Sequence, residues 1–101
     1  MAAQPTNVHA IDEAVTQHIG DGRDYQTLEE NLGFRATYDA NRDIVYIFLP
    51  GRSTNRTMIK PIERIAVWRK WMQTRSFSPG DYNDISRSPS YLLAVLKQVS
   101  G

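Results

Sequence analysis

The sequence predicts a single α+β domain made of two amino-terminal helices, an antiparallel β-hairpin and two carboxy-terminal helices packed on the sheet. Three observations lead to this fold class. The chain has 101 residues, which is a usual size for one domain. Apolar residues recur at helical spacing near both ends, and between them lies a run rich in β-branched and aromatic residues. We therefore expect residues 1–101 to form one globular domain, with residues 1–5 flexible.

The first predicted helix lies within residues 6–20. Thr6 or Asn7 can cap its amino terminus, and Gly20 can end it. Its apolar residues lie three or four positions apart and therefore share one face of a helix: Val8, Ile11, Val15 and Ile19.

A second, shorter helix is predicted between a capping Asp24 and a terminating Gly33. Tyr25, Leu28 and Leu32 have the spacing that would place them on one face of this helix.

A β-hairpin is predicted next, because Phe34, Ala36 and Tyr38 alternate with polar residues and the stretch "DANRD" can form a turn. The run that follows, residues 44–49, is apolar at every position, which is typical of a central strand covered on both faces. The segment "RSTNRTMI", residues 52–59, fits either an arginine-rich loop or a third strand.

Two helices are predicted after the sheet. Pro61 suits the first turn of a helix that continues to Arg75 without a breaker. Its buried stripe is predicted to contain Ile62, Ile65, Trp68 and Met72. The last helix begins at Pro89 after a capping Ser88 and ends at Gly101. The two helices are predicted to share one buried cluster: Ile65, Trp68, Leu92, Val95 and Leu96.

Charge is distributed unevenly along the chain, although its formal net charge is only +1. Residues 1–43 contain eight acidic and three basic residues, whereas residues 44–101 contain nine basic and three acidic residues. Between residues 52 and 75 the only acid is Glu63. This asymmetry indicates either a basic patch for an anionic partner or two halves of one fold that attract each other.

The flank of the predicted third helix combines Arg64, Trp71 and Arg75, at spacings of seven and four positions. Two guanidinium groups beside an indole can contact phosphate and stack on an unpaired base. The alternative is an indole that is partly covered by the side chains of its neighbours.

Polar and basic residues outside this helix extend the predicted contact surface. The stretch "PGRSTNRT" offers groups that contact phosphates without reading sequence, although a charged edge also deters strand pairing. Arg87 precedes a helix amino terminus, where anions are attracted, although capping alone explains Ser88. The predicted nucleic-acid-binding residues are Arg52, Arg56, Lys60, Arg64, Trp71, Arg75 and Arg87.

No catalytic, metal-binding or cofactor-binding motif is found in the sequence. Because the chain has no cysteine, a disulfide scaffold, a thiolate zinc site and a cysteine nucleophile are excluded. His9 and His18 are nine positions apart and would point to opposite sides of a helix, so they cannot share a metal ion. We expect no catalytic residue, no metal, no cofactor and no enzyme activity. A small ribonuclease that leaves no local motif is the alternative.

These features favour a small non-enzymatic nucleic-acid-binding or regulatory protein that contacts DNA or RNA through residues 52–75. The alternative is a protein–protein interaction module or homodimeric adaptor, in which the acidic and basic segments pair. A binder of small ligands comes third. The sequence shows no secretion signal and no apolar run long enough to cross a membrane, so we expect a cytoplasmic location and no membrane partner.

Overall fold

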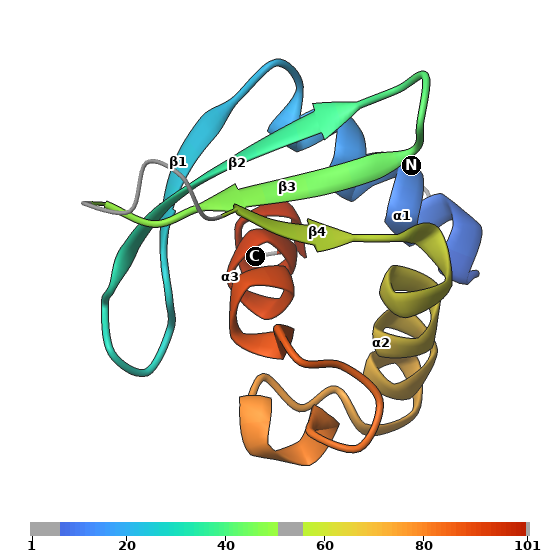
Figure 1. The fold of residues 1–101 in the computed structure, drawn as a ribbon. Helices are drawn as coiled ribbons and strands as arrows, with labels where there is room; N and C mark the ends of the chain where they lie inside the picture. The colour runs from blue at the N-terminus through green and yellow to red at the C-terminus, as the bar shows by residue number, and fades with distance from the viewer. Residues whose placement is uncertain (1–6, 51–55, 101) are drawn as a thin grey trace.

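The structure is a computed structural model that describes residues 7–50 and 56–100. These residues form an α+β fold in which three α-helices lie on one face of a four-stranded antiparallel sheet (Figure 1). The predicted fold class is confirmed, but the order of elements differs. The predicted flexible segment, residues 1–5, lies outside the described residues. In chain order the elements are α1 (Val8–Ile19), β1 (Arg23–Gln26), β2 (Gly33–Asp39), β3 (Ile44–Phe48), β4 (Arg56–Ile59), α2 (Pro61–Thr74), the 3-10 helix η1 (Pro79–Tyr82) and α3 (Pro89–Ser100).

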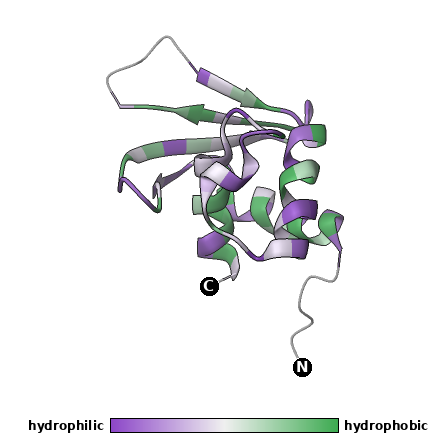
Figure 2. Cartoon of the chain, turned by 90° about the horizontal axis from the view of Figure 1, so that it is seen from below, coloured by the Kyte–Doolittle hydropathy of each residue, from purple (hydrophilic) through white to green (hydrophobic). Residues whose placement is uncertain are grey.

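Helix α1 begins and ends as its sequence predicts. The Asn7 side chain accepts a hydrogen bond from the Ala10 N–H at 2.8 Å, which satisfies one of the free donors of the first turn. Gly20 has a φ of 55° and donates its N–H to the Thr16 carbonyl at 3.0 Å. This left-handed conformation is open to glycine at little steric cost. Hydrophilic and hydrophobic bands alternate around the helices (Figure 2), and the hydrophobic side of α1 faces the core.

The predicted second helix is wrong, because residues 23–26 form strand β1 instead. Tyr25 of β1 pairs with Phe34 of β2, and their rings stack with centroids 5.6 Å apart. Both rings are buried, whereas Leu28 and Leu32, which helical spacing would bury, are exposed. A helix of about ten residues is marginal in water, so pairing with β2 decides the conformation.

The four strands lie in sequence order, and each is antiparallel to the next. The predicted hairpin is the β2–β3 pair, whose register sets Ala36 opposite Ile47. For the segment 52–59, the strand alternative is confirmed over residues 56–59, which form β4. Residues 52–55 lie outside the described part of the chain.

Among the described elements, helices cover only one face of strand β3, which differs from the prediction that both of its faces are covered, and on the other face Tyr46 is 9% exposed. Val45 and Ile47 point toward the helices and are fully buried. Ile44, Tyr46 and Phe48 alternate with them and therefore point to the opposite face. The described helices all lie on the first face (Figure 1). The unbroken apolar run thus reflects a second apolar face of the sheet.

Helix α2 buries a different side from the predicted one. Its buried residues are Arg64, Val67, Trp68 and Trp71. Ile62 is 79% exposed, and Ile65 and Met72 are only partly buried. The helix is therefore rotated by about 100°, the angle between successive helical residues. The predicted cluster is confirmed for Trp68 and for the α3 residues, with Ile65 at its margin. The α3 residues are Leu92, Val95 and Leu96.

The cause of this rotation is Arg64, whose side chain is fully buried. Its Nε and Nη2 donate to the two carboxylate oxygens of Asp12 at 2.7 and 3.0 Å, and Nη2 also donates to Oδ1 of Asp43 at 2.6 Å. Its Nη1 donates to the carbonyl oxygens of Asp43 and Ile59 at 2.9 and 3.2 Å. Because the five donors of the guanidinium have five acceptors, the charge can be buried.

Two further side chains form hydrogen bonds to the carboxylates of Asp12 and Asp43. The Trp68 indole N–H donates to Oδ1 of Asp12 at 3.0 Å, and the Tyr38 hydroxyl donates to Oδ1 of Asp43 at 2.7 Å. The hydrogen bonds from Tyr38 and Arg64 lower the pKa of Asp43. Burial alone would lower the pKa of Arg64, but the two carboxylates raise it above its ordinary value. These five residues, Asp12, Tyr38, Asp43, Arg64 and Trp68, are called the Arg64 network.

Replacing Arg64 with alanine is expected to lower the free energy of unfolding by about 3 kcal/mol, because it removes the donors of two carboxylates and leaves a void. Urea unfolding at pH 7 measures this change. The matched control is Arg69→Ala on the exposed side of the same helix, with an expected change below about 0.5 kcal/mol. Equal effects of the two substitutions would show that Arg64 does not organise the core.

The Arg64 network should also make stability depend on acidity. The pKa of Asp43 lies below its ordinary value of 3.8 in the folded protein, so its stabilising effect is complete above that value and is lost as the pH falls through the folded-state pKa. Asparagine removes the charge and tolerates the φ of 57° at this position. We expect the free energy of unfolding of Asp43→Asn to fall less steeply than that of the wild type from about pH 5 to pH 2. Parallel curves in urea unfolding across this range would contradict the assignment.

Candidate functional site

The structure does not bring the described members of the predicted nucleic-acid-binding set together on one surface. Arg56 lies on the sheet, and Lys60 precedes the first residue of α2. Arg75 follows the last residue of α2, about 20 Å away at 1.5 Å per residue. Arg87 is exposed on the segment before α3, and Arg52 lies outside the described residues.

Two of the predicted contact residues, Arg64 and Trp71, are buried. Arg64 donates all its hydrogen bonds inside the core. Trp71 is only 8% exposed. Its ring lies 4.5 Å below the guanidinium of Arg75 and 5.8 Å from the ring of Phe77. The alternative interpretation, an indole covered by its neighbours, describes Trp71, and a base has no free ring face to stack on.

A different set of residues forms an aromatic and basic surface. On the face of the sheet that points away from the helices, Phe48 of β3 lies directly between Arg35 of β2 and Arg56 of β4 in the strand register. Both arginines are exposed, and Phe48 is partly exposed. We call this surface the open sheet face, and its residues are Asp24, Arg35, Thr37, Asp39, Ile44, Tyr46, Phe48, Arg56 and Met58.

The arginines of the open sheet face are held loosely. The guanidinium carbon of Arg56 lies 4.7 Å from the ring centroid of Tyr46, which it largely covers. Arg35 forms an ion pair with Asp24 at 3.1 Å, and both side chains are more than half exposed. Exposed pairs of this kind contribute little to stability. Both guanidinium groups can therefore turn toward an external anion at low cost.

The alternation of buried and exposed residues on β2 indicates this surface in the sequence, whereas the uniformly apolar run of β3 does not. Exposed Arg35 alternates with buried Phe34 and Ala36 on β2, which indicates a strand with one solvent-facing side. Since β2 pairs with β3, the neighbouring strand must share that side. The pairing register, and so the alignment of Arg56 with Phe48, is not visible in the sequence.

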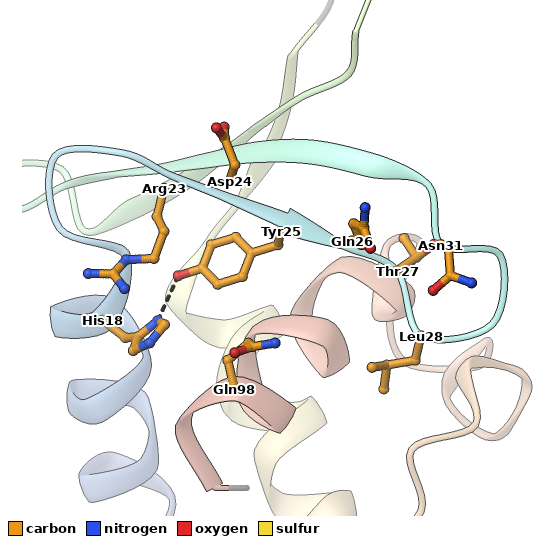
Figure 3. Close-up of a pocket in the computed structure, with 9 residues that line it drawn as sticks. All are labelled: His18, Arg23, Asp24, Tyr25, Gln26, Thr27, Leu28, Asn31 and Gln98. Atoms are coloured by element: carbon orange, nitrogen blue, oxygen red, sulfur yellow. Dashed lines mark hydrogen bonds between the residues drawn. The ribbon is translucent and has the colours of Figure 1, made fainter.

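A second candidate site is a hollow of about 640 Å³ beside strand β1 (Figure 3). We call it the β1 groove. Its walls come from β1 and the turn that follows, with Arg23, Tyr25 and Leu28, from His18 of α1 and from Gln98 of α3. Arg23 forms no ion pair with any described residue.

The floor of the β1 groove contains a hydrogen bond between His18 and Tyr25, whose Nδ1 and hydroxyl oxygen are 2.8 Å apart. Burial raises the pKa of Tyr25 to about 12. Burial, followed by the charge of Arg23, lowers the pKa of His18. The hydrogen bond therefore joins a protonated hydroxyl and a neutral imidazole. A hydroxyl that keeps its proton so firmly is poorly matched to acid–base chemistry near neutral pH, so this pair is suited to shaping a binding site.

Within residues 7–50 and 56–100, no group of three His, Asp or Glu side chains is placed to hold a metal ion. In the same described ranges no helix has the length and apolar character needed to span a bilayer. Comparisons with protein-family models, curated proteins and solved structures gave no match to this chain. The geometry of the open sheet face and of the β1 groove therefore carries the functional argument.

Replacing Arg23 with glutamine is expected to raise the pKa of His18, because it removes the positive charge that disfavours the imidazolium ion. The value should stay below the ordinary 6.5, since burial of the ring remains. An NMR titration of the imidazole measures it, with Arg69→Gln on α2 as the control for a lost surface charge. An unchanged His18 titration in Arg23→Gln would mean that Arg23 does not face the groove.

Proposed function

We propose that this protein binds single-stranded DNA or RNA on the open sheet face and is not an enzyme. The observation that carries the proposal is the row formed by Arg35, Phe48 and Arg56 across three neighbouring strands. A cytoplasmic location is part of the proposal, because a chain without cysteine fits a reducing compartment.

The side chains of this row, Arg35, Phe48 and Arg56, suit contact with a single-stranded nucleic acid. Side chains directly opposite each other on a sheet have Cβ atoms about 5 Å apart, so Arg35 and Arg56 lie on either side of the Phe48 ring. A base can stack on Phe48 while the guanidinium groups contact the phosphates on both sides of it. Arg56 already stacks on Tyr46, and its outer face offers a second planar surface to a neighbouring base.

The shape of the surface favours single strands over a duplex. The major groove of B-DNA admits a helix or a two-stranded ribbon, whereas the open sheet face spans β1, β2, β3 and β4. Bases within a duplex also have no free face for Phe48. The row offers guanidinium and ring groups rather than a set of amides that read base edges, so weak sequence preference is expected.

The alternative function, a protein-interaction module, is supported by another part of the sheet, the edge at β1. The homodimeric form of that alternative has less support. Asp12 and Asp43, from the acidic part of the chain, pair with Arg64 inside the same molecule. These charges are therefore not free to join two copies.

Fluorescence anisotropy with labelled oligo(dT) and oligo(U) tests the proposal. At 50 mM salt we expect dissociation constants on the order of micromolar, and a steep loss of affinity as salt rises. Phe48→Ala should weaken binding by about 1 to 3 kcal/mol, because it removes one stacking surface. Arg35→Ala and Arg56→Ala should each reduce the salt slope by about 0.7, the value for one single-strand phosphate contact.

Arg69→Ala is the matched control, since it removes an exposed arginine from the helical layer and should leave affinity and salt slope unchanged. Trp71→Phe, which changes a buried ring, should also bind normally. No binding of either oligonucleotide at tens of micromolar protein would exclude the proposed function. Binding that depends on Arg69 as strongly as on Arg35 and Arg56 would place the contact elsewhere.

A further inference from the structure

Strand β1 is an edge of the sheet, and its hydrogen-bonding pattern shows which backbone groups face outward. The Thr27 N–H donates to the Leu32 carbonyl at 3.0 Å, just beyond the pairs Tyr25 with Phe34 and Arg23 with Ala36. In an antiparallel ladder every second pair is hydrogen-bonded. The pairs of Thr27, Tyr25 and Arg23 therefore bond to β2, and the N–H and C=O groups of the residues between them point away from the sheet.

These outward residues are Asp24 and Gln26. Among the described residues, no hydrogen bond to their backbone groups is found outside the β1–β2 ladder. At the opposite edge, the same alternation turns the backbone groups of Arg56 and Met58 on β4 outward. Strand β1 is therefore one of two edges that offer backbone donors and acceptors to an added strand, and it is the edge beside the β1 groove.

The β1 groove lies beside this edge, on the helical side of the sheet (Figure 3). Arg23 and Tyr25 point into it from β1, while His18 of α1 and Gln98 of α3 form its far wall. A strand added next to β1 would project every second side chain into this hollow. Edge and hollow together have the form of a peptide-binding groove, in which main-chain bonds give affinity and a pocket selects alternate side chains.

We propose that an extended peptide segment with an acidic side chain binds as a fifth strand along β1, with that side chain opposite Arg23. Asp24 and Gln26 exchange main-chain hydrogen bonds with the peptide. The peptide residues opposite Arg23 and Tyr25 then form non-hydrogen-bonded pairs, in which side chains approach most closely. The residue opposite Tyr25, two positions from the acid, fills the hollow above the His18–Tyr25 pair.

A second copy of this chain fits the same edge less well. With a two-fold axis at Tyr25, Arg23 would face Thr27 of the copy, which brings no acid to it. The two Tyr25 rings would also approach the same hollow from both sides. An axis at Asp24 would set two carboxylates opposite each other, which is unfavourable.

The test uses a panel of fluorescent peptides about nine residues long on a threonine-rich background, which favours extended structure. The peptide is expected to run antiparallel to β1, so the residue opposite Tyr25 comes two positions before the residue opposite Arg23. Aspartate, lysine or glycine therefore occupies one position, and tyrosine, leucine or glycine occupies the position two residues earlier. We expect the aspartate peptides with tyrosine or leucine to bind best, with dissociation constants on the order of 10 to 100 μM. Amide exchange at Asp24 and Gln26 should slow by about tenfold or more in the complex.

Two protein variants distinguish the contribution of the β1 backbone to peptide binding from the contribution of the Arg23 charge. Gln26→Pro removes an outward N–H while the bonds to β2 remain, and it should weaken every peptide by about tenfold or more. Arg23→Glu should reverse the preference between aspartate and lysine peptides. Arg69→Glu is the control for a charge reversal elsewhere and should change neither result. Retained oligonucleotide binding or an unchanged thermal melt shows that the variants are folded.

Three results would overturn the proposal. The first is the absence of binding by any peptide at millimolar concentration. The second is peptide binding that Gln26→Pro leaves unchanged, since the contact would then not use the β1 edge. The third is a dimer in sedimentation experiments that Gln26→Pro dissociates, because a second copy would then occupy the edge.

Discussion

The Arg64 guanidinium lies in the core with hydrogen bonds to α1, to the residue before β3 and to β4, and most of the fold depends on this contact. A buried cation with unpaired donors costs several kcal/mol. The elements can therefore pack only where Asp12 and Asp43 reach it. This requirement turns α2 so that Trp68 faces inward and Ile62 faces solvent. It also accounts for part of the uneven charge distribution, since two acids of the first half of the chain are neutralised by a base of the second half.

Because the described helices share one face of the sheet, the other face and the edge at β1 are left for contacts with partners. The two surfaces differ chemically. The open sheet face presents side chains perpendicular to the sheet, among them Phe48 between two arginines. The β1 edge presents main-chain groups in the plane of the sheet. They meet at Asp24, whose side chain pairs with Arg35 while its backbone faces the edge. The two proposed contacts, a peptide strand at β1 and a nucleic acid on the open sheet face, therefore use different groups of the sheet, and the Asp24–Arg35 ion pair lies between them.

Periodicity and capping residues predicted some helices and strands correctly and others wrongly. Helix α1 follows its periodicity and caps, and the β2–β3 hairpin follows its alternation, because both patterns depend on residues close in sequence. The segment from Asp24 to Gly33 has helical spacing, yet its first residues form a strand. The stacking of Tyr25 on Phe34 and the ladder with β2 stabilise the strand, and neither is visible within the segment. Likewise Trp71 has the spacing of an exposed flank, and its burial follows from the rotation of α2.

The sequence by itself determined the α+β class, the bounds of α1, the hairpin and the presence of the last two helices, because propensity, caps and periodicity act over a few residues. Of the predicted contact residues that the structure describes, only Arg56 lies in the row on the open sheet face, beside Phe48 and Arg35, which were not predicted. Only the tertiary structure decided which arginine is buried and which are exposed. Arg64 is separated from Asp12 by fifty-two positions, and Arg35 from Phe48 by the turn of the hairpin. Such pairs form when whole elements pack, and the free energy of satisfying a buried charge outweighs the small hydrophobic gain of turning Ile62 inward.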